Sequence, residues 1–415
     1  MKTQNTTFAK WVTLVCFTLA SMSGLKSQNP VKDSTNTTKE EIRQINLNEI
    51  RISASFMPEK STPLRLTSVN HSEISAKATG QTFPELLKRV PGIYATAESG
   101  SYGDAKINIR GFKQENISVM LNGIPISGLT TGGMYWNNWA GLADATSMIQ
   151  VQKGPGASML SDNSMGGTIN IITTLPVERA SASAGVSATD YGLFKYQASL
   201  NSGVLKNGWA LSLSTSYVTG KTFIESSDVN SWAYLLTVSK KIGERHSLVM
   251  TLLGSPERHQ QRSAKLTAAE VEEYGTSYNK NWGWYDGKRR NISENFYHKP
   301  YLTIHHFYKI TPATTMNSAV YLSTGDGGGK WSESKGKSII EFQKDGQIDW
   351  NEVISTNRDP QTGESIRVQT DYLAGHLQTG FKWGINTKIS PNLSLESGLH
   401  YQFYSTWEKE VITGG

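Results

Sequence analysis

The chain has 415 residues, of which 37% are hydrophobic and 10% aromatic, and its formal net charge is +6. Lysine and arginine form no dense cluster, so a nucleic-acid-binding surface is not indicated. Glycine, serine, threonine and aromatic residues are abundant and aliphatic blocks are few, which favours a β-rich protein.

Residues 1–27 have the pattern of a secretory signal peptide. Lys2 and Lys10 precede a short apolar run, 11–20, which is followed by small residues. The run is too short to span a bilayer, and the alternative is a helix of a folded core. Cys16, the only cysteine, lies inside it, so the mature protein is expected to lack disulfides. No window of 18 apolar residues follows, so a membrane protein with this sequence would cross as a β-barrel.

Residues 28–56 are polar and read as a flexible leader. Near its end, Ile50 and Ile52 alternate with polar residues in a short strand-like island. Such an island either adds an edge strand to another protein's sheet or is the first strand of the domain that follows. The spacing leaves both interpretations open.

Residues 57–177 are predicted to form a compact α/β unit. Thr82 is the candidate N-cap of a short amphipathic helix that ends at Pro91-Gly92. Asn122-Gly123 is the strongest two-residue hairpin signal. Strand patterns occur at 105–112, 117–126, 147–153 and 168–173, and glycine-rich turns at 154–156 and 166–167 precede the last of them.

After residue 178 the chain consists of segments of about ten residues that alternate between apolar and small or polar side chains. In one of them Trp209, Leu211, Leu213 and Tyr217 share a face, and alanine and serine occupy the other. A strand of a soluble sandwich would alternate too, but the length of the segments and their serine- and glycine-rich face favour a membrane barrel. Nine such segments are predicted, at about 181–190, 194–204, 208–219, 232–241, 246–254, 299–309, 315–323, 376–388 and 393–404.

The connections between these segments alternate in length. Short ones are expected at 205–207, 242–245, 310–314 and 389–392, and long ones start at Gly220, Ser255 and Thr324 and run to about 231, 298 and 375. The connection at 191–193 is short where a long one is expected. Short turns on one side and long loops on the other are typical of an outer-membrane barrel.

Residues of about 46–175 resemble the plug domain of TonB-dependent outer-membrane receptors of Gram-negative bacteria. The matching motifs, in order, are LLKRVPGI at 86–93, INIRGF at 107–112, LNGIPI at 121–126, IQVQKGPGAS at 149–158 and GGTINIIT at 166–173. The resemblance implies a mixed α/β plug domain followed by an antiparallel transmembrane β-barrel, in a family whose barrels have about 22 strands. It also implies that the protein is embedded in outer-membrane lipid and imports a small-molecule ligand by an energy-coupled process. No cofactor is expected.

The same resemblance implies that TonB pairs by strand addition with a box near the N-terminus. The residues at that position match the family's box loosely; they are Asn48, Glu49, Ile50, Arg51, Ile52 and Ser53. The chain departs from the family in having nine strands, and Glu408–Gly415 reads as the start of an extracellular loop. We therefore expect an incomplete barrel and a truncated sequence that does not transport as it stands.

Candidate ligand contacts lie in two regions. The apical plug loops carry Tyr102, Tyr135, Trp136 and Trp139, whose alternative role is to pack the plug against the barrel wall. The loop at 281–298 carries Trp282, Trp284, Tyr285, Arg289 and Arg290, which combine rings and cations suited to an anionic iron chelate. The alternative there is an aromatic girdle and a solvated loop.

His305 and His306 are adjacent on one strand and must point to opposite faces, so they are a poor joint metal site. No dedicated metal site is predicted, and no catalytic constellation is predicted either. The function indicated is import of a scarce nutrient such as a ferric siderophore, haem or cobalamin. Glycan importers of the same family usually carry an extra N-terminal domain, for which the leader is too short. The alternative from another class is a passive porin or an outer-membrane adhesin.

Overall fold

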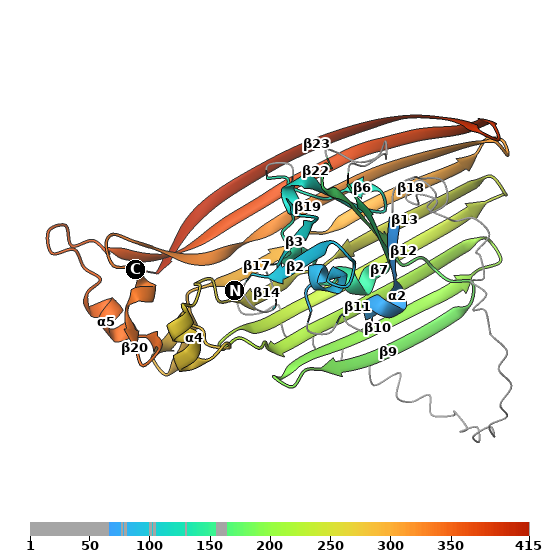
Figure 1. Ribbon diagram of the computed structural model, residues 1–415. Helices are drawn as coiled ribbons and strands as arrows, with labels where there is room; N and C mark the ends of the chain where they lie inside the picture. The colour runs from blue at the N-terminus through green and yellow to red at the C-terminus, as the bar shows by residue number, and fades with distance from the viewer. Residues whose placement is uncertain are drawn as a thin grey trace, which may run out of the picture. The chain divides into compact units, whose positions relative to one another are not determined.

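The computed structural model describes residues 66–75, 78, 81–98, 102, 105–128, 131–154 and 164–414. The predicted signal peptide, the leader and the TonB-box candidate at 48–53 lie outside the described residues. Within them, a mixed α/β unit is followed from β9 onward by long antiparallel strands (Figure 1). This is the predicted fold class.

The first unit, which we call the plug, contains two small sheets. The larger has the order β1 (Leu66–Asn70), β7 (Thr146–Lys153), β8 (Gly167–Thr173), β5 (Ile117–Leu121) and β6 (Ile124–Pro125). β8 is antiparallel to β7 but parallel to β5. The smaller sheet joins β2 (Ile93–Ala97), β3 (Ala105–Ile109) and β4 (Phe112–Lys113). The helical turns are α2 (His71–Ser75), η1 (Phe83–Leu87), η2 (Gln114–Asn116), η3 (Trp136–Trp139) and α3 (Leu142–Ala145).

The turn chemistry of the plug follows the sequence. Asn122 and Gly123 both have positive φ, 50° and 78°, and join β5 to β6 with Leu121 opposite Ile124, which confirms the hairpin. A Cβ on Gly167 would lie 2.4 Å from the carbonyl oxygen of Gln152, so close backbone packing requires glycine there.

The predicted helix after Thr82 is shorter than an α-helix. Thr82 and Glu85 form a capping box, but the helical segment is a single 3₁₀ turn, η1, with a proline in its first turn. The chain leaves it through Gly92, whose φ is 83°. Tertiary packing of Leu86 and Leu87, both buried, stabilises a turn too short to be helical alone.

The second part of the chain is one antiparallel meander, which we call the wall. β12 pairs with both β13 and β14, and β19 pairs with both β17 and β18, so the strands occupy nine positions, one for each predicted segment. Pro256 and Pro300 fall at the two interruptions, as expected where a ladder donor is missing. The strands are β9 (Ala180–Ala188), β10 (Leu193–Val204), β11 (Trp209–Lys221), β12 (Asp228–Ile242), β13 (His246–Gly254), β14 (Glu257–Gln260), β17 (Glu294–His298), β18 (Tyr301–Lys309), β19 (Thr314–Ser334), β22 (Arg367–Ser390) and β23 (Leu393–Gly414).

Several wall strands are longer than predicted. β11 and β12 leave only residues 222–227 between them, and β19 and β22 leave only 335–366. The prediction that Glu408–Gly415 begins a loop is wrong, because β23 stays paired with β22 up to Gly414 opposite Gln369. At about 3.3 Å per residue, such strands are longer than the thickness of a hydrocarbon core, which is about 30 Å. Their charged ends therefore extend beyond the lipid, where apolar residues need not alternate with polar ones.

The alternation of the wall strands separates two faces. Trp209, Leu211 and Leu213 are exposed, whereas Ala210 and Ser212 are buried on the face toward the plug. Wall residues Leu235, Leu253, Tyr301, Ala319 and Tyr321 share one hydrophobic core with the plug. Within the described part of the chain, no helix has the length and apolar character needed to span a membrane.

Candidate ligand-binding site

The two long loops of the wall fold together. The first, 261–293, carries α4 (Ala268–Tyr274), β15 (Trp282–Tyr285) and β16 (Lys288–Asn291). The second, 335–366, carries η4 (Ile339–Glu341), β20 (Gln343–Lys344), β21 (Gln347–Ile348) and α5 (Trp350–Ser355). Tyr278 of the first loop donates a hydrogen bond to the carbonyl of Gly346 in the second at 2.8 Å. They share a small core of Ile292, Ile339, Phe342, Ile348, Trp350 and Val353.

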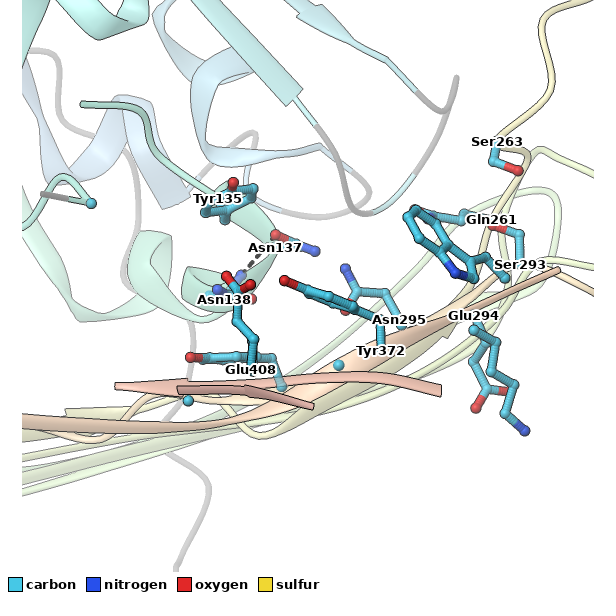
Figure 2. A pocket seen from close by; sticks show the side chains of 18 of the residues that line it. Tyr135, Asn137, Asn138, Gln261, Ser263, Ser293, Glu294, Asn295, Tyr372 and Glu408 are labelled. Carbon is cyan, nitrogen blue, oxygen red and sulfur yellow. Dashed lines mark hydrogen bonds between the residues drawn. The ribbon is translucent and has the colours of Figure 1, made fainter. Parts of the chain in front are cut away.

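A cavity of about 780 Å³ lies between the plug, the wall and these loops. This volume is within the range of small-molecule sites. Figure 2 shows Tyr135, Asn137 and Asn138 of the plug on one side and Tyr372 and Glu408 of the wall on the other. Further wall residues that line it are Asn295 and Tyr297 of β17, Gly329 and Trp331 of β19, His376 of β22 and Tyr404 of β23.

The four predicted plug contacts occupy different places. Tyr135 is 60% exposed and lines the cavity, as does the buried Trp139, which has the Lys299 ammonium 5.1 Å from its ring centre. Trp136 is 2% exposed and is absent from the described lining residues. Its ring stacks on Phe83 at 5.4 Å.

Tyr102, the fourth predicted plug contact, does not line the cavity. Its ring meets the buried His259 of β14 edge-on at 5.8 Å, so it packs the plug against the wall. His259 Nδ1 is in turn hydrogen-bonded to Glu257 Oε2. These contacts match the packing alternative considered for the aromatic residues of the plug loops.

The five predicted loop contacts all lie on the hairpin of β15 and β16, which flanks the cavity without supplying a lining residue among those described. Arg289 forms an ion pair with Asp228 at 3.1 Å. Trp282 is buried, and Trp284 and Tyr285 are exposed. Their role in ligand binding stays a prediction.

Arg290 is held within the same loop structure. Its guanidinium lies 4.4 Å from the ring centre of Trp350 and 5.3 Å from that of Tyr285. It also donates a hydrogen bond to Gln369. Partial burial lowers the pKa of Arg290 below its ordinary value, but the side chain remains cationic.

Sequence reasoning missed most of the wall residues that line the cavity. Tyr297, Trp331 and Tyr372 lie near the ends of strands, at positions that were expected to be loop, whereas Tyr404 is the last residue of a predicted strand segment. The available signal was their alternation with small residues, extended beyond the predicted strand limits. Asn137 and Asn138 lie between Trp136 and Trp139, and the sequence reasoning selected only the aromatic residues of this loop as ligand contacts.

A polar latch fixes the plug to the wall. Asp144 of α3 accepts hydrogen bonds from the Lys195 ammonium of β10 and from Ser216 of β11, the latter at 2.6 Å. The backbone N–H of Gly141 donates to the Ser255 hydroxyl at 2.9 Å. Lys382 of β22 donates to the carbonyl of Gly123 at 2.7 Å.

Among the described residues, no group of three or more His, Cys, Asp or Glu side chains is placed to hold a metal ion.

Comparison with known proteins agrees with this architecture. The family model of the TonB-dependent receptor plug domain matches residues 58–168. The vitamin B12 transporter BtuB of Photobacterium profundum is 26% identical over 153 residues, which are 37% of this chain and 24% of that protein. The probable TonB-dependent siderophore receptor PirA of Acinetobacter baumannii is 26% identical over 169 residues, 37% of this chain and 22% of that protein.

Solved structures show the same fold. The ferric yersiniabactin uptake receptor FyuA from Yersinia pestis superposes with a TM-score of 0.64 at 12% identity, over 87% of this chain and 52% of that one. The unliganded ferric citrate transporter FecA gives a TM-score of 0.62 at 16% identity, over 85% and 49%. The matches thus span about a quarter of the curated relatives and about half of the solved structures. Residues 58–168 thus match the plug model of the TonB-dependent receptors, and the described part of the chain shares the fold of the plug and of part of the barrel in such receptors.

Proposed function

We propose that this protein acts in the outer membrane as a receptor that binds a scarce nutrient and imports it with energy supplied through TonB. The observation that carries the proposal is the cavity between the plug and the wall, at the end of the molecule that bears the long loops. A ligand bound there contacts the plug directly, so remodelling of the plug is coupled to release of the ligand.

The relatives support the ligand class. Proteins that match this chain are named for vitamin B12 and for siderophores, so we propose a ferric siderophore, haem or cobalamin as the type of ligand. The exposed apolar face of the wall strands supports a position in outer-membrane lipid. We retain the division into signal peptide 1–27, leader 28–56, plug 57–177 and barrel part 178–415.

A passive porin or an adhesin fits the structure less well. A plug held by the Asp144 latch and by a shared hydrophobic core occupies the inner face of the wall. Such a plug has no use in a passive pore, and it is equally unnecessary for adhesion. Transport rather than catalysis is also the activity that the family implies.

The coupling step can be tested at Ile50. Proline there removes a backbone N–H that strand addition to TonB would use, so Ile50→Pro should abolish energy-dependent uptake by the intact receptor while ligand binding survives. Ile50→Ala keeps the N–H and serves as the control. Normal uptake by the proline variant would place the TonB box elsewhere, and uptake by wild type that persists without TonB would contradict the proposed function.

A further inference from the structure

β19 contains three consecutive glycines, Gly327, Gly328 and Gly329, and they differ in whether the surrounding backbone leaves room for a side chain. A Cβ on Gly327 would lie 2.3 Å from the carbonyl oxygen of Phe296, and one on Gly328 would lie 2.2 Å from that of Tyr372. Close backbone packing therefore requires glycine at both. At Gly329 the nearest atom is the carbonyl oxygen of Glu294 at 3.3 Å, and φ is not positive, so an alanine would fit with a small adjustment.

Gly329 instead borders the cavity, so a side chain there would occupy the space in which a ligand lies. Glycine destabilises a strand relative to alanine, and it often marks a place where a ligand approaches the backbone closely. The absence of a side chain at Gly329 leaves the backbone of β19 bare toward the cavity.

The neighbours of Gly329 form a slot around this bare backbone. Asn295 of β17 and Tyr372 of β22 stand opposite Gly329 on its two sides in the sheet. Trp331 follows two residues later, and its ring centre is 6.0 Å from that of Tyr372. Across the cavity lies Tyr135 of the plug (Figure 2). A flat ring placed over Gly329 would therefore meet aromatic faces from both sides.

The polar groups around the slot do not select for negative charge. Two lysines, Lys299 and Lys330, and two carboxylates, Glu294 and Glu408, border the cavity, and arginine is absent from the described lining residues. Glu294 is already ion-paired with Arg258, outside the lining. Lys299 is already engaged with the ring of Trp139. An anionic chelate is normally gripped by an excess of cations, most often arginine.

The amide side chains of the lining favour a different partner. Asn137, Asn138 and Asn295 can each donate and accept hydrogen bonds, and Glu408 can accept them. This combination suits hydroxyl and amide groups, which also donate and accept. The lining therefore offers more hydrogen-bond partners to a ring whose rim carries uncharged polar groups than to a carboxylate or a catecholate.

We propose that the slot over Gly329 binds an uncharged, ring-bearing part of the ligand whose rim carries hydroxyl or amide groups. The inference rests on the proposed function and specifies the chemistry that the ligand presents to the slot. Three sources share this chemistry: a corrinoid, an amide-rich ferric hydroxamate and a neutral oligosaccharide.

The test is equilibrium binding to the purified intact receptor, followed by tryptophan fluorescence and calorimetry. The uncharged probes are cyanocobalamin, ferrichrome and an array of neutral oligosaccharides, and the anionic probes are ferric citrate and ferric enterobactin. We expect one of the uncharged probes to bind, with Gly329→Leu weakening that binding about tenfold or more and Gly329→Ala weakening it less. Gly384→Ala is the matched control, because its Cβ would meet only the carbonyl oxygen of Ser397 at 3.7 Å.

Tyr372→Ala provides a second variant if Gly329→Leu fails to assemble, and it should weaken the same probe. Binding of an anionic probe without any uncharged one, or equal affinity of wild type and the slot variants, would overturn the inference. If an anionic probe alone binds and its uptake depends on TonB, the inference fails but the proposed function remains supported. Binding of an uncharged probe at the slot without energy-dependent uptake would support the inference and contradict the proposed function.

Discussion

Tyr135 and Trp136 are adjacent in the chain but lie in different environments. The Tyr135 ring is mostly exposed at the cavity, and the Trp136 ring is buried against Phe83 with its Nε1 donating to Gln114 at 3.2 Å. We expect Tyr135→Ala to weaken ligand binding by about 1–3 kcal/mol and to leave stability unchanged. Trp136→Ala should instead destabilise the plug by about 3–5 kcal/mol. Binding isotherms and urea unfolding of both variants check this, and a stable Trp136→Ala receptor that has lost binding would contradict it.

Asp144 illustrates a second residue-scale effect. The Lys195 side chain is 6% exposed, so removal of its partner leaves a nearly buried ammonium without compensation. Asp144→Ala should weaken the attachment of the plug by about 3 kcal/mol, seen as protease cleavage of the plug at lower urea. The exposed pair Lys106–Glu98 is the control, since Lys106→Ala should cost less than about 1 kcal/mol. Equal cleavage profiles for the Asp144 and Lys106 variants would show that the latch is not needed.

At the scale of elements, the two long loops of the wall behave as one folded unit. A Cβ on Gly283 of β15 would lie 2.1 Å from the carbonyl oxygen of Ile348, so the loops are in backbone contact. They position Asn281 and Ile292 of the first loop and Ser338 of the second at the border of the cavity. The cavity is therefore bounded by a loop structure that has its own core.

Helix α4 within this loop unit has a predictable pH dependence. The hydrogen bond from Lys280, followed by the bond from the Thr267 backbone, holds the pKa of Glu270 below its ordinary value. Because the folded-state pKa is depressed, the stabilisation is present above the unfolded value and is lost as pH falls through the folded value. Hydrogen exchange of α4, corrected for intrinsic rates, should be slower in wild type than in Glu270→Gln at pH 7. The difference should vanish in acid below the folded pKa, and a difference that persists there would contradict this origin.

At the scale of the whole molecule, the wall has two ends with different connections. The described turns at 205–208, 243–245, 310–313 and 391–392 are short, and the folded loop unit lies at the opposite end. In an outer-membrane barrel the longer loops face outward. Lys288→Cys on the exposed β16 should therefore react with an impermeable maleimide on intact cells. Glu244→Cys, in a short turn, should react only after permeabilisation, and the reverse pattern would invert the proposed orientation.

Local chemistry determined much of this architecture. The Asn122-Gly123 hairpin, the glycine turn at 166–167 and the alternation at Trp209, Leu211 and Leu213 are visible in the sequence because backbone sterics and side-chain period are local properties. The nine strand positions of the wall follow from the same period. These patterns also carried the family resemblance.

Only the tertiary structure decided what depends on distant segments. The parallel pairing of β5 with β8 and the burial of Trp136 rather than Tyr135 follow from packing against residues far away in the chain. The same holds for the ends of β22 and β23, where pairing between strands continues through charged residues without an apolar signal. The cavity is likewise assembled from the plug and from β17, β19, β22 and β23, so its polar balance became visible only when these were brought together.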